Sequence, residues 1–299
     1  MDVSEQELGR IRFKHLISKE RKMYSVTLPF LLAIASTTLG APTARDTFEC
    51  TQIVMEFATD SYVAAQATGQ LDPLFGWVNP NWTYIENNVV TDVRKGVLSK
   101  SLRIDHNRTN MDLTQCATYT ELISADPANP YVIGTQIFFN IDMKIVSIDS
   151  IVTTTNSWLF NATKTLQLVQ GENWDPIPEA KRDSRAAIQA AGDAYMDIWS
   201  NATAANVVPW GSPCVRMEGS AYTGSGKDNS CKSGIPTNHN QKPNTHRRYV
   251  IDEAMGSVSI LDVWEHMMNA ADSHEFRLEN GKLRFVHTMT SCGGKRCTL

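Results

Sequence analysis

The sequence contains none of the short motifs that mark nucleotide-dependent, metal-dependent or nucleophilic enzymes. It has no phosphate-binding loop, no GxGxxG and no Gly-x-Ser-x-Gly. Its histidines show neither HxH nor HExxH spacing, and its cysteines are better explained as bridges, so we predict no metal and no cofactor. Chemistry that requires a bound nucleotide or an activated nucleophile is therefore disfavoured.

The sequence also lacks a strong charge of one sign and a long apolar run. Its 299 residues carry 28 Lys and Arg against 32 Asp and Glu, a net charge of −4, which gives no footprint for nucleic acid. The apolar core Val26–Ala35 is too short for a membrane span, which needs roughly 20 residues. Arg21 and Lys22 precede this core, and the small residues Thr38 and Gly40 follow it. This pattern predicts an N-terminal extension and signal peptide over residues 1–40, with an uncleaved signal anchor as the alternative.

Six cysteines agree with passage through the secretory pathway. An even number of cysteines in a secreted chain favours disulfides, although six allow many pairings. We prefer Cys214–Cys231, because it would staple a long polar loop to the preceding strand. The pairings Cys50–Cys116 and Cys292–Cys297 complete the set without a comparable argument.

Four Asn-x-Thr sequons point the same way as the leader and the cysteines. Their asparagines are Asn81, Asn107, Asn161 and Asn201. We therefore predict a secreted or lumenal glycoprotein.

Two stretches are predicted to form β-hairpins. Asp272–Thr290 reads as two strands joined by the turn Glu279–Lys282, whose Asn-Gly pair tolerates positive φ. Tyr131–Thr154 is a weaker copy that turns at Asn140–Met143. Further strands are predicted at Trp82–Asn87, within Pro209–Tyr222, at Arg247–Glu253 and at Gly256–Trp264. Leu102–Thr109 alternates weakly, and Leu113–Ser124 fits a strand or a helix.

Two helices are predicted, one before the strands of each part of the chain. Ala44–Leu71 ends at Gly69, and Asp183–Ser200 is capped by Asp183 or Ser184. The predicted buried face of the first helix carries Phe48, Ile53, Val54, Phe57, Tyr62 and Ala65.

The two parts of the chain repeat one order of elements. Asp60-Ser61-Tyr62 corresponds to Asp193-Ala194-Tyr195, and Glu86 to Glu218, at offsets of about 130 to 140 residues. The sequence thus predicts an α+β fold of two tandem cone-shaped halves, each a helix on a curved antiparallel sheet. The first would span residues 41–156, and a connection with the second would span residues 157–299.

Several segments resemble a family of secreted fungal proteins, and this resemblance covers most of residues 45–292. The segments are VPWGSPCVRMEG (Val208–Gly219), RRYVIDEAMGSVSIL (Arg247–Leu261), DSHEFRLENGKLRFVHT (Asp272–Thr288), YVIGTQI (Tyr131–Ile137) and Trp158-Leu159-Phe160-Asn161. The family is similar in architecture to tandem nuclear-transport-factor-2-like cones. Some of its members resemble hetero-Diels-Alderases, which join a tropolone-derived o-quinone methide to a humulene-type sesquiterpene. Because that fold hosts enzymes and plain binding modules alike, the fold does not fix the function.

Polar residues concentrate on the predicted strands of the second half. Arg216 and Glu218 share one strand face, and Arg248 and Asp252 share another, because side chains alternate with period 2. His274 alternates with Phe276 and Leu278, and His287 alternates with Phe285 and Leu283. Both histidines thus fall on mainly apolar faces, while Arg277 and Arg284 point the opposite way. The predicted catalytic residues are Arg216 and His287, as donors to a substrate carbonyl; the predicted substrate-binding residues are Tyr195, Trp199, Glu218, Asp252, His274 and Arg277.

Each of these assignments has a purely structural alternative. The two histidines could be core residues satisfied by backbone carbonyls, the charged residues could form cross-strand ion pairs, and the aromatic residues could be core.

The resulting hypothesis is a cofactor-free enzyme, most concretely a hetero-Diels-Alderase, acting on an apolar polyketide or terpenoid substrate. Cycloaddition mainly requires two partners held in a reactive pose, with a hydrogen bond to the carbonyl where negative charge develops. The alternatives are a secreted small-molecule-binding or interaction protein without catalysis, and a dehydratase or isomerase with His287 as its base. Self-association into a homo-oligomer is also predicted.

Overall fold

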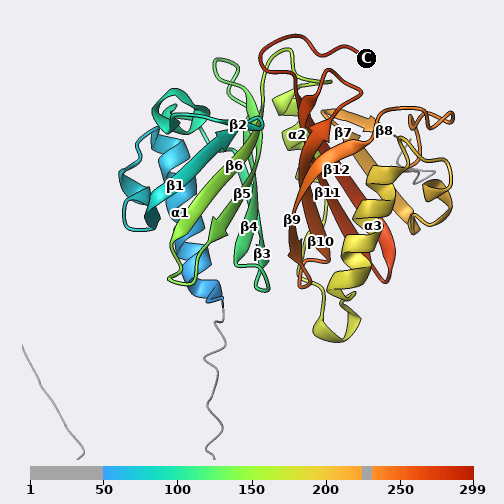
Figure 1. Ribbon diagram of the computed structural model, residues 1–299, viewed down its shortest axis with the longest axis horizontal. Helices are drawn as coiled ribbons and strands as arrows, with labels where there is room; N and C mark the ends of the chain where they lie inside the picture. The colour runs from blue at the N-terminus through green and yellow to red at the C-terminus, as the bar shows by residue number, and fades with distance from the viewer. Residues whose placement is uncertain (1–49, 224–230) are drawn as a thin grey trace, which may run out of the picture. The chain divides into compact units, whose positions relative to one another are not determined.

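The computed structural model describes residues 50–223 and 231–299, and the segment Thr47–Leu299 forms one compact unit. The predicted leader therefore lies outside the described residues. Figure 1 shows two sheets, each crossed by one long helix. The prediction of an α+β chain with two tandem halves, each a helix on a curved sheet, is confirmed.

The first half contains one helix and six strands. Helix α1 (Gln52–Thr68) crosses the sheet formed by β1 (Val78–Glu86), β2 (Val89–Val90), β3 (His106–Asp112), β4 (Ala117–Ser124), β5 (Tyr131–Phe139) and β6 (Ile145–Thr153). The predicted end of this helix is confirmed, because Gly69 takes the left-handed conformation, with φ of 70°, and its N–H bonds to Ala65.

The second half repeats this plan. Helix α3 (Arg185–Asp197) crosses β7 (Trp210–Glu218), β8 (Ala221–Thr223), β9 (Asn244–Asp252), β10 (Ser257–Trp264), β11 (Ala270–Glu279) and β12 (Lys282–Ser291). Ser184 caps the helix by accepting a hydrogen bond from the N–H of Ala187, as one of the two predicted caps.

Strand order is identical in the two sheets. The orders are β2-β1-β6-β5-β4-β3 and β8-β7-β12-β11-β10-β9. All neighbours are antiparallel except β1 with β6 and β7 with β12, which are parallel. Both predicted hairpins are present as β5–β6 and β11–β12, and the second turns through Asn280 and Gly281, which both have positive φ.

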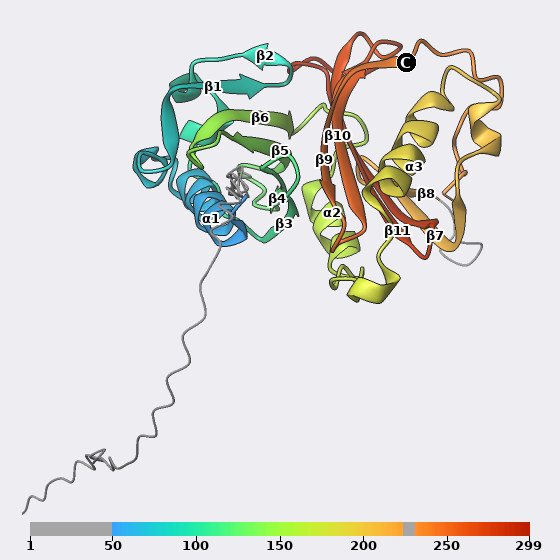
Figure 2. The same ribbon diagram turned by 60° about the horizontal axis from the view of Figure 1, so that its bottom comes forward.

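The segment between the halves contains a helix that the sequence analysis missed. Helix α2 (Ala162–Val169) begins at Asn161, whose side chain accepts a hydrogen bond from the N–H of Lys164. Figure 2 shows α2 beside the strands of the second sheet, and it also contacts β4 and β5. Short 3-10 helices cover Asp72–Leu74, Val93–Lys95, Val97–Ser99, Glu179–Lys181 and Ala204–Asn206.

The two sheets pack face to face, and we call this contact the junction. Its apolar part joins Tyr119 and Ile151 of the first sheet to Val250, Leu261 and Met289 of the second. Each sheet is therefore buried on both faces, by its own helix on one side and by the other sheet on the second. All eight residues of β4 are buried, which explains why Leu113–Ser124 gave no clear period-2 signal.

The predicted buried face of α1 was wrong in part. Ile53 and Phe57 are 55% and 56% exposed. The buried stripe instead contains Met55, Ala58, Thr59, Tyr62, Ala65 and Gln66. Tyr62 and Ala65 were predicted correctly, whereas Met55 and Ala58 take the buried positions expected for Ile53 and Phe57.

The three predicted disulfide pairings are all present. Cys214–Cys231 ties the polar loop to β7, Cys50–Cys116 ties the start of α1 to the residue before β4, and Cys292–Cys297 closes a short ring near the C-terminus. These bridges indicate an oxidising compartment. Among the described residues, no helix combines the length and hydropathy needed to cross a membrane.

All four sequon asparagines are exposed to solvent. Asn161 uses its side-chain oxygen to cap α2, and the oxygen of Asn201 accepts from the backbone N–H of Thr203. Glycosylation itself stays a prediction.

Candidate ligand site

The sheet of the second half separates the predicted site residues into two groups. Tyr195, Trp199, Arg216, Glu218 and His274 lie in the interior of the second half, between α3 and the sheet. Asp252, Arg277 and His287 lie on the other face of the sheet, at the junction. The two predicted catalytic residues therefore do not share a site.

The interior group is held together by its own contacts. The guanidinium of Arg216 donates to the hydroxyl of Tyr195 at 3.0 Å and lies 3.7 Å from a carboxylate oxygen of Glu218. The other oxygen of Glu218 accepts a hydrogen bond from the indole of Trp158 at 3.1 Å. Burial raises the pKa of Tyr195 to about 12, so it is a neutral donor and acceptor. The prediction that Arg216 and Glu218 share a face is correct, and together they form an ion pair.

His287 lies between two carboxylates at the junction. Its Nδ1 is 3.2 Å from Glu121 and its Nε2 is 2.7 Å from Glu172. Burial alone would lower the pKa of His287, but these two carboxylates outweigh burial and raise the pKa to about 10. An imidazolium with both nitrogens paired has no free lone pair, so His287 cannot act as a base in this arrangement.

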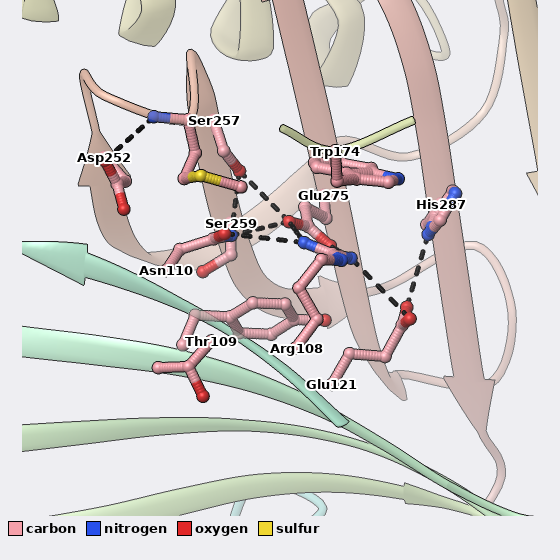
Figure 3. A network of polar contacts seen from close by, with 12 residues as sticks. Arg108, Thr109, Asn110, Glu121, Trp174, Asp252, Ser257, Ser259, Glu275 and His287 are labelled. Atoms are coloured by element: carbon pink, nitrogen blue, oxygen red, sulfur yellow. Dashed lines mark hydrogen bonds and ion pairs between the residues drawn. The ribbon is translucent and has the colours of Figure 1, made fainter. Parts of the chain in front are cut away.

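Figure 3 shows the larger network to which His287 belongs. Arg108 makes a two-pronged ion pair with Glu275 at 2.6 and 2.7 Å, and its guanidinium carbon lies 3.7 Å from the centroid of the Trp174 ring. Glu275 also accepts hydrogen bonds from Asn110 and Ser257. This network connects strands of both halves through charged groups that are almost fully buried.

The other two predicted residues of the junction group, Asp252 and Arg277, also contact groups of the protein. Asp252 accepts hydrogen bonds from the backbone N–H groups of Met111 and Met255, at 2.7 and 3.0 Å. Arg277 pairs with Glu279 and donates to the carbonyl of Asp175. Both residues are therefore engaged in contacts within the protein.

One detail of the predicted alternation was wrong. The register of β11 with β12 shifts between Arg277, which lies opposite Phe285, and Leu278, which lies opposite Leu283. This bulge places Leu283 on the interior face, although Phe285 and His287 face the junction. A local bulge moves every following side chain to the opposite face, which a strict period of 2 cannot anticipate.

Five cavities of the described residues have volumes between about 10 and 340 Å³, and none is lined by Arg216, His274 or His287. Neither predicted catalytic residue therefore faces one of these five cavities. One of them, of about 270 Å³, lies where α3 ends, and we call it the loop pocket. It is lined by Ile198, Ala205, Asn206, Trp210, Lys232, Ile235, Pro236, Thr237 and His239.

The loop pocket combines an apolar wall with a cation. Ile198, Trp210, Ile235 and Pro236 provide the wall. The ammonium of Lys232 lies 5.1 Å from the centroid of the Trp210 ring. Sequence reasoning missed this pocket, because its lining comes from the end of a helix, a short 3-10 helix, a strand end and a polar loop.

The pocket adjoins the interior of the second half through aromatic contact. The ring of Trp210 lies 5.9 Å from that of Tyr195, the residue whose hydroxyl bonds to Arg216. A ligand in the pocket would thus contact Trp210, whose ring packs against Tyr195 of the interior group.

Comparisons with known proteins identify a domain without naming an activity. A family described as "Domain of unknown function (DUF8021)" matches residues 181–290. No curated protein matches the chain. A solved NTF2-like protein of unknown function from Shewanella baltica OS155 is similar at 10% identity with a TM-score of 0.26; the match covers 34% of this chain and 94% of that one. Since neither description names an activity, a functional proposal has to rest on the geometry.

Proposed function

We propose that the protein is a secreted binding protein for one small, mostly apolar molecule. The observation that carries this proposal is the loop pocket, whose wall is formed largely by the apolar side chains of Ile198, Trp210 and Ile235. Ligand sites of proteins are typically concave and apolar with a few placed polar groups, which is the composition found here.

The size of the pocket favours binding over cycloaddition. Its volume of about 270 Å³ lies just below the range of roughly 300 to 1,000 Å³ that is typical of small-molecule sites. One small ligand fits such a space, whereas a hetero-Diels-Alder reaction needs room for a quinone methide and a sesquiterpene together. Arg216 and His287 are both buried and already engaged by groups of the protein, which agrees with this choice.

The test is equilibrium binding of 1-anilinonaphthalene-8-sulfonate to the folded protein, measured by fluorescence. This probe has an apolar aromatic body and an anionic group. Ala205→Phe would fill the pocket, and Ile235→Ala would remove part of its wall; we expect each to weaken binding by at least about tenfold, which is about 1.4 kcal/mol. Trp82→Ala, on β1 of the first half, is the matched control and should leave binding unchanged.

Equal binding by the wild type and the Ala205→Phe variant would show that the probe sits elsewhere, and the proposal would fail. A second arm incubates the protein with a quinone methide precursor and a humulene-type alcohol. Product formed above the background rate, and abolished by Ala205→Phe, would replace binding with cycloaddition as the function of this pocket.

A further inference from the structure

Three ionisable side chains meet in the interior of the second half, away from the loop pocket. Asp262 on β10 lies directly opposite Asp272 on β11, and His274 follows two residues later on the same face. One ligand atom from each lies within 4.8 Å of the other two. Asp262 and Asp272 are fully buried and His274 is 4% exposed.

Most polar atoms of these three side chains have no hydrogen-bond partner. Both carboxylate oxygens of Asp262, one oxygen of Asp272 and both ring nitrogens of His274 lack one. Nδ1 of His274 and Oδ2 of Asp272 are 2.8 Å apart, but without hydrogen-bond geometry. The other oxygen of Asp272 accepts from the hydroxyl of Thr290 at 2.7 Å. Buried polar atoms are normally paired, so such a concentration needs an explanation.

The first half shows that the fold does not require these residues. Ile133 and Thr135 are the third and fifth residues of β5, as Asp272 and His274 are of β11. Leu122 lies opposite Ile133 in the same register that places Asp262 opposite Asp272. Leu122 and Ile133 are ordinary core residues.

The polar member of the first half is fully partnered. Thr135 contacts the hydroxyls of Tyr62 and Ser150 at 2.7 and 2.8 Å. The first half thus has two apolar residues and one hydrogen-bonded threonine at the positions where the second half has two carboxylates and an imidazole.

A cation would satisfy the second half's cluster. Two buried carboxylates repel each other unless a positive charge lies between them. In an equilateral triangle with sides of 4.8 Å, the centre is about 2.8 Å from each corner, so inward shifts of under about 1 Å would reach zinc–ligand distances of roughly 2.0–2.2 Å. Carboxylate oxygen together with imidazole nitrogen suits zinc or a similar transition metal.

We propose that Asp262, Asp272 and His274 bind one divalent transition-metal ion of the zinc class in the interior of the second half. The hydroxyl of Thr290 orients Asp272 from outside the ligand set. Because the three ligands are buried, the ion enters while the chain folds.

The test measures metal content and thermal stability of the full chain. The protein is unfolded with its disulfides intact in the presence of a chelator, then refolded with zinc or with chelator. Elemental analysis of the zinc sample should give about one ion per chain, and the melting temperature should exceed that of the chelator sample by several degrees, because the ion binds the folded state.

Two variants and one control make the result specific. Asp262→Asn should lose the ion. The graft Asp262→Leu with Asp272→Ile and His274→Thr places first-half residues at these positions, and it should fold without metal and melt at one temperature in both samples. His287→Gln is the control, because it alters the similar Glu121–Glu275–His287 cluster and should retain the ion. In that cluster, both ring nitrogens of His287 and both oxygens of Glu275 already have partners.

Two results would overturn the proposal. If wild-type protein refolded in excess zinc is metal-free and its melting temperature is unchanged, the carboxylates share a proton instead of a metal ion. If the graft retains one ion per chain, the ion is bound elsewhere.

Discussion

The charge on His287 makes a measurable prediction about alkaline stability. The pKa of His287 is raised from 6.5 to about 10 in the folded protein. This difference of about 3.5 pKa units corresponds to roughly 5 kcal/mol of stabilisation at about 1.4 kcal/mol per unit. Because the folded pKa lies above the unfolded one, the contribution is complete below about pH 6.5 and is lost as the pH rises through 10.

The perturbation is His287→Gln, which keeps a polar side chain at the site but removes the positive charge. Removing one partner of a buried ion pair typically costs about 3–5 kcal/mol. We therefore expect the variant to be less stable than the wild type by that amount near pH 6.5, with the difference shrinking steadily towards pH 10. The wild type should lose up to about 1.4 kcal/mol per pH unit across this window.

The assay is urea unfolding followed by tryptophan fluorescence at several pH values between 6 and 10. All six cysteines are paired, so no thiol titrates in this range. His246→Gln is the control, because His246 is an exposed histidine on β9 whose removal should leave the wild-type slope intact. If His287→Gln keeps the wild-type slope, the imidazolium is not the source of the pH dependence and the reasoning fails.

Three further predictions concern single structural features. Replacing Cys214 and Cys231 together by alanine opens a loop with a sequence separation of 17 residues and should lower the free energy of unfolding by about 3 kcal/mol in denaturant titrations. Gly134→Ala would place a methyl group 2.7 Å from the buried hydroxyl of Tyr119, so we expect a loss of about 1–3 kcal/mol, and a variant as stable as wild type would contradict this packing. Ser184→Ala removes the cap of α3 and should lower the free energy of unfolding by about 1 kcal/mol. An unchanged melting curve would show that the cap does not contribute to stability.

The features that could be predicted from the sequence are those with a local cause. The Asn280-Gly281 turn needs two residues that tolerate positive φ, and both the turn and its hairpin are present. The cap at Ser184 follows from the same kind of short-range chemistry. The duplication was visible because equivalent residues recur at a nearly constant offset, and the identical strand orders bear it out.

The junction could not be predicted, because its residues are far apart in the sequence. Arg108 pairs with Glu275 across 167 positions, and Glu121 with His287 across 166. An apolar strand face looks the same in the sequence whether it packs on a helix or on a second sheet. From its own strand alone, His287 is predicted to contact a substrate, although its partners are carboxylates of the other half and of the connection.

The metal-ligand cluster escaped detection for a related reason. Motif searches test spacing along one chain segment, whereas Asp262 and Asp272 are brought together by strand pairing. Only a comparison of strand pairing in the two halves shows that Asp262 and Asp272 stand where the first half has the apolar pair Leu122 and Ile133.

Ion pairs across the junction have a consequence for cooperativity. Besides Arg108 with Glu275, Asp112 pairs with Arg185 at 2.6 Å and Asp149 with Arg248 at 2.6 Å. A half released from its neighbour would keep these charges at a surface built for burial and would expose the apolar residues between them. Neither half is thus expected to persist alone, and the duplicated chain should melt in a single transition, as one thermodynamic unit.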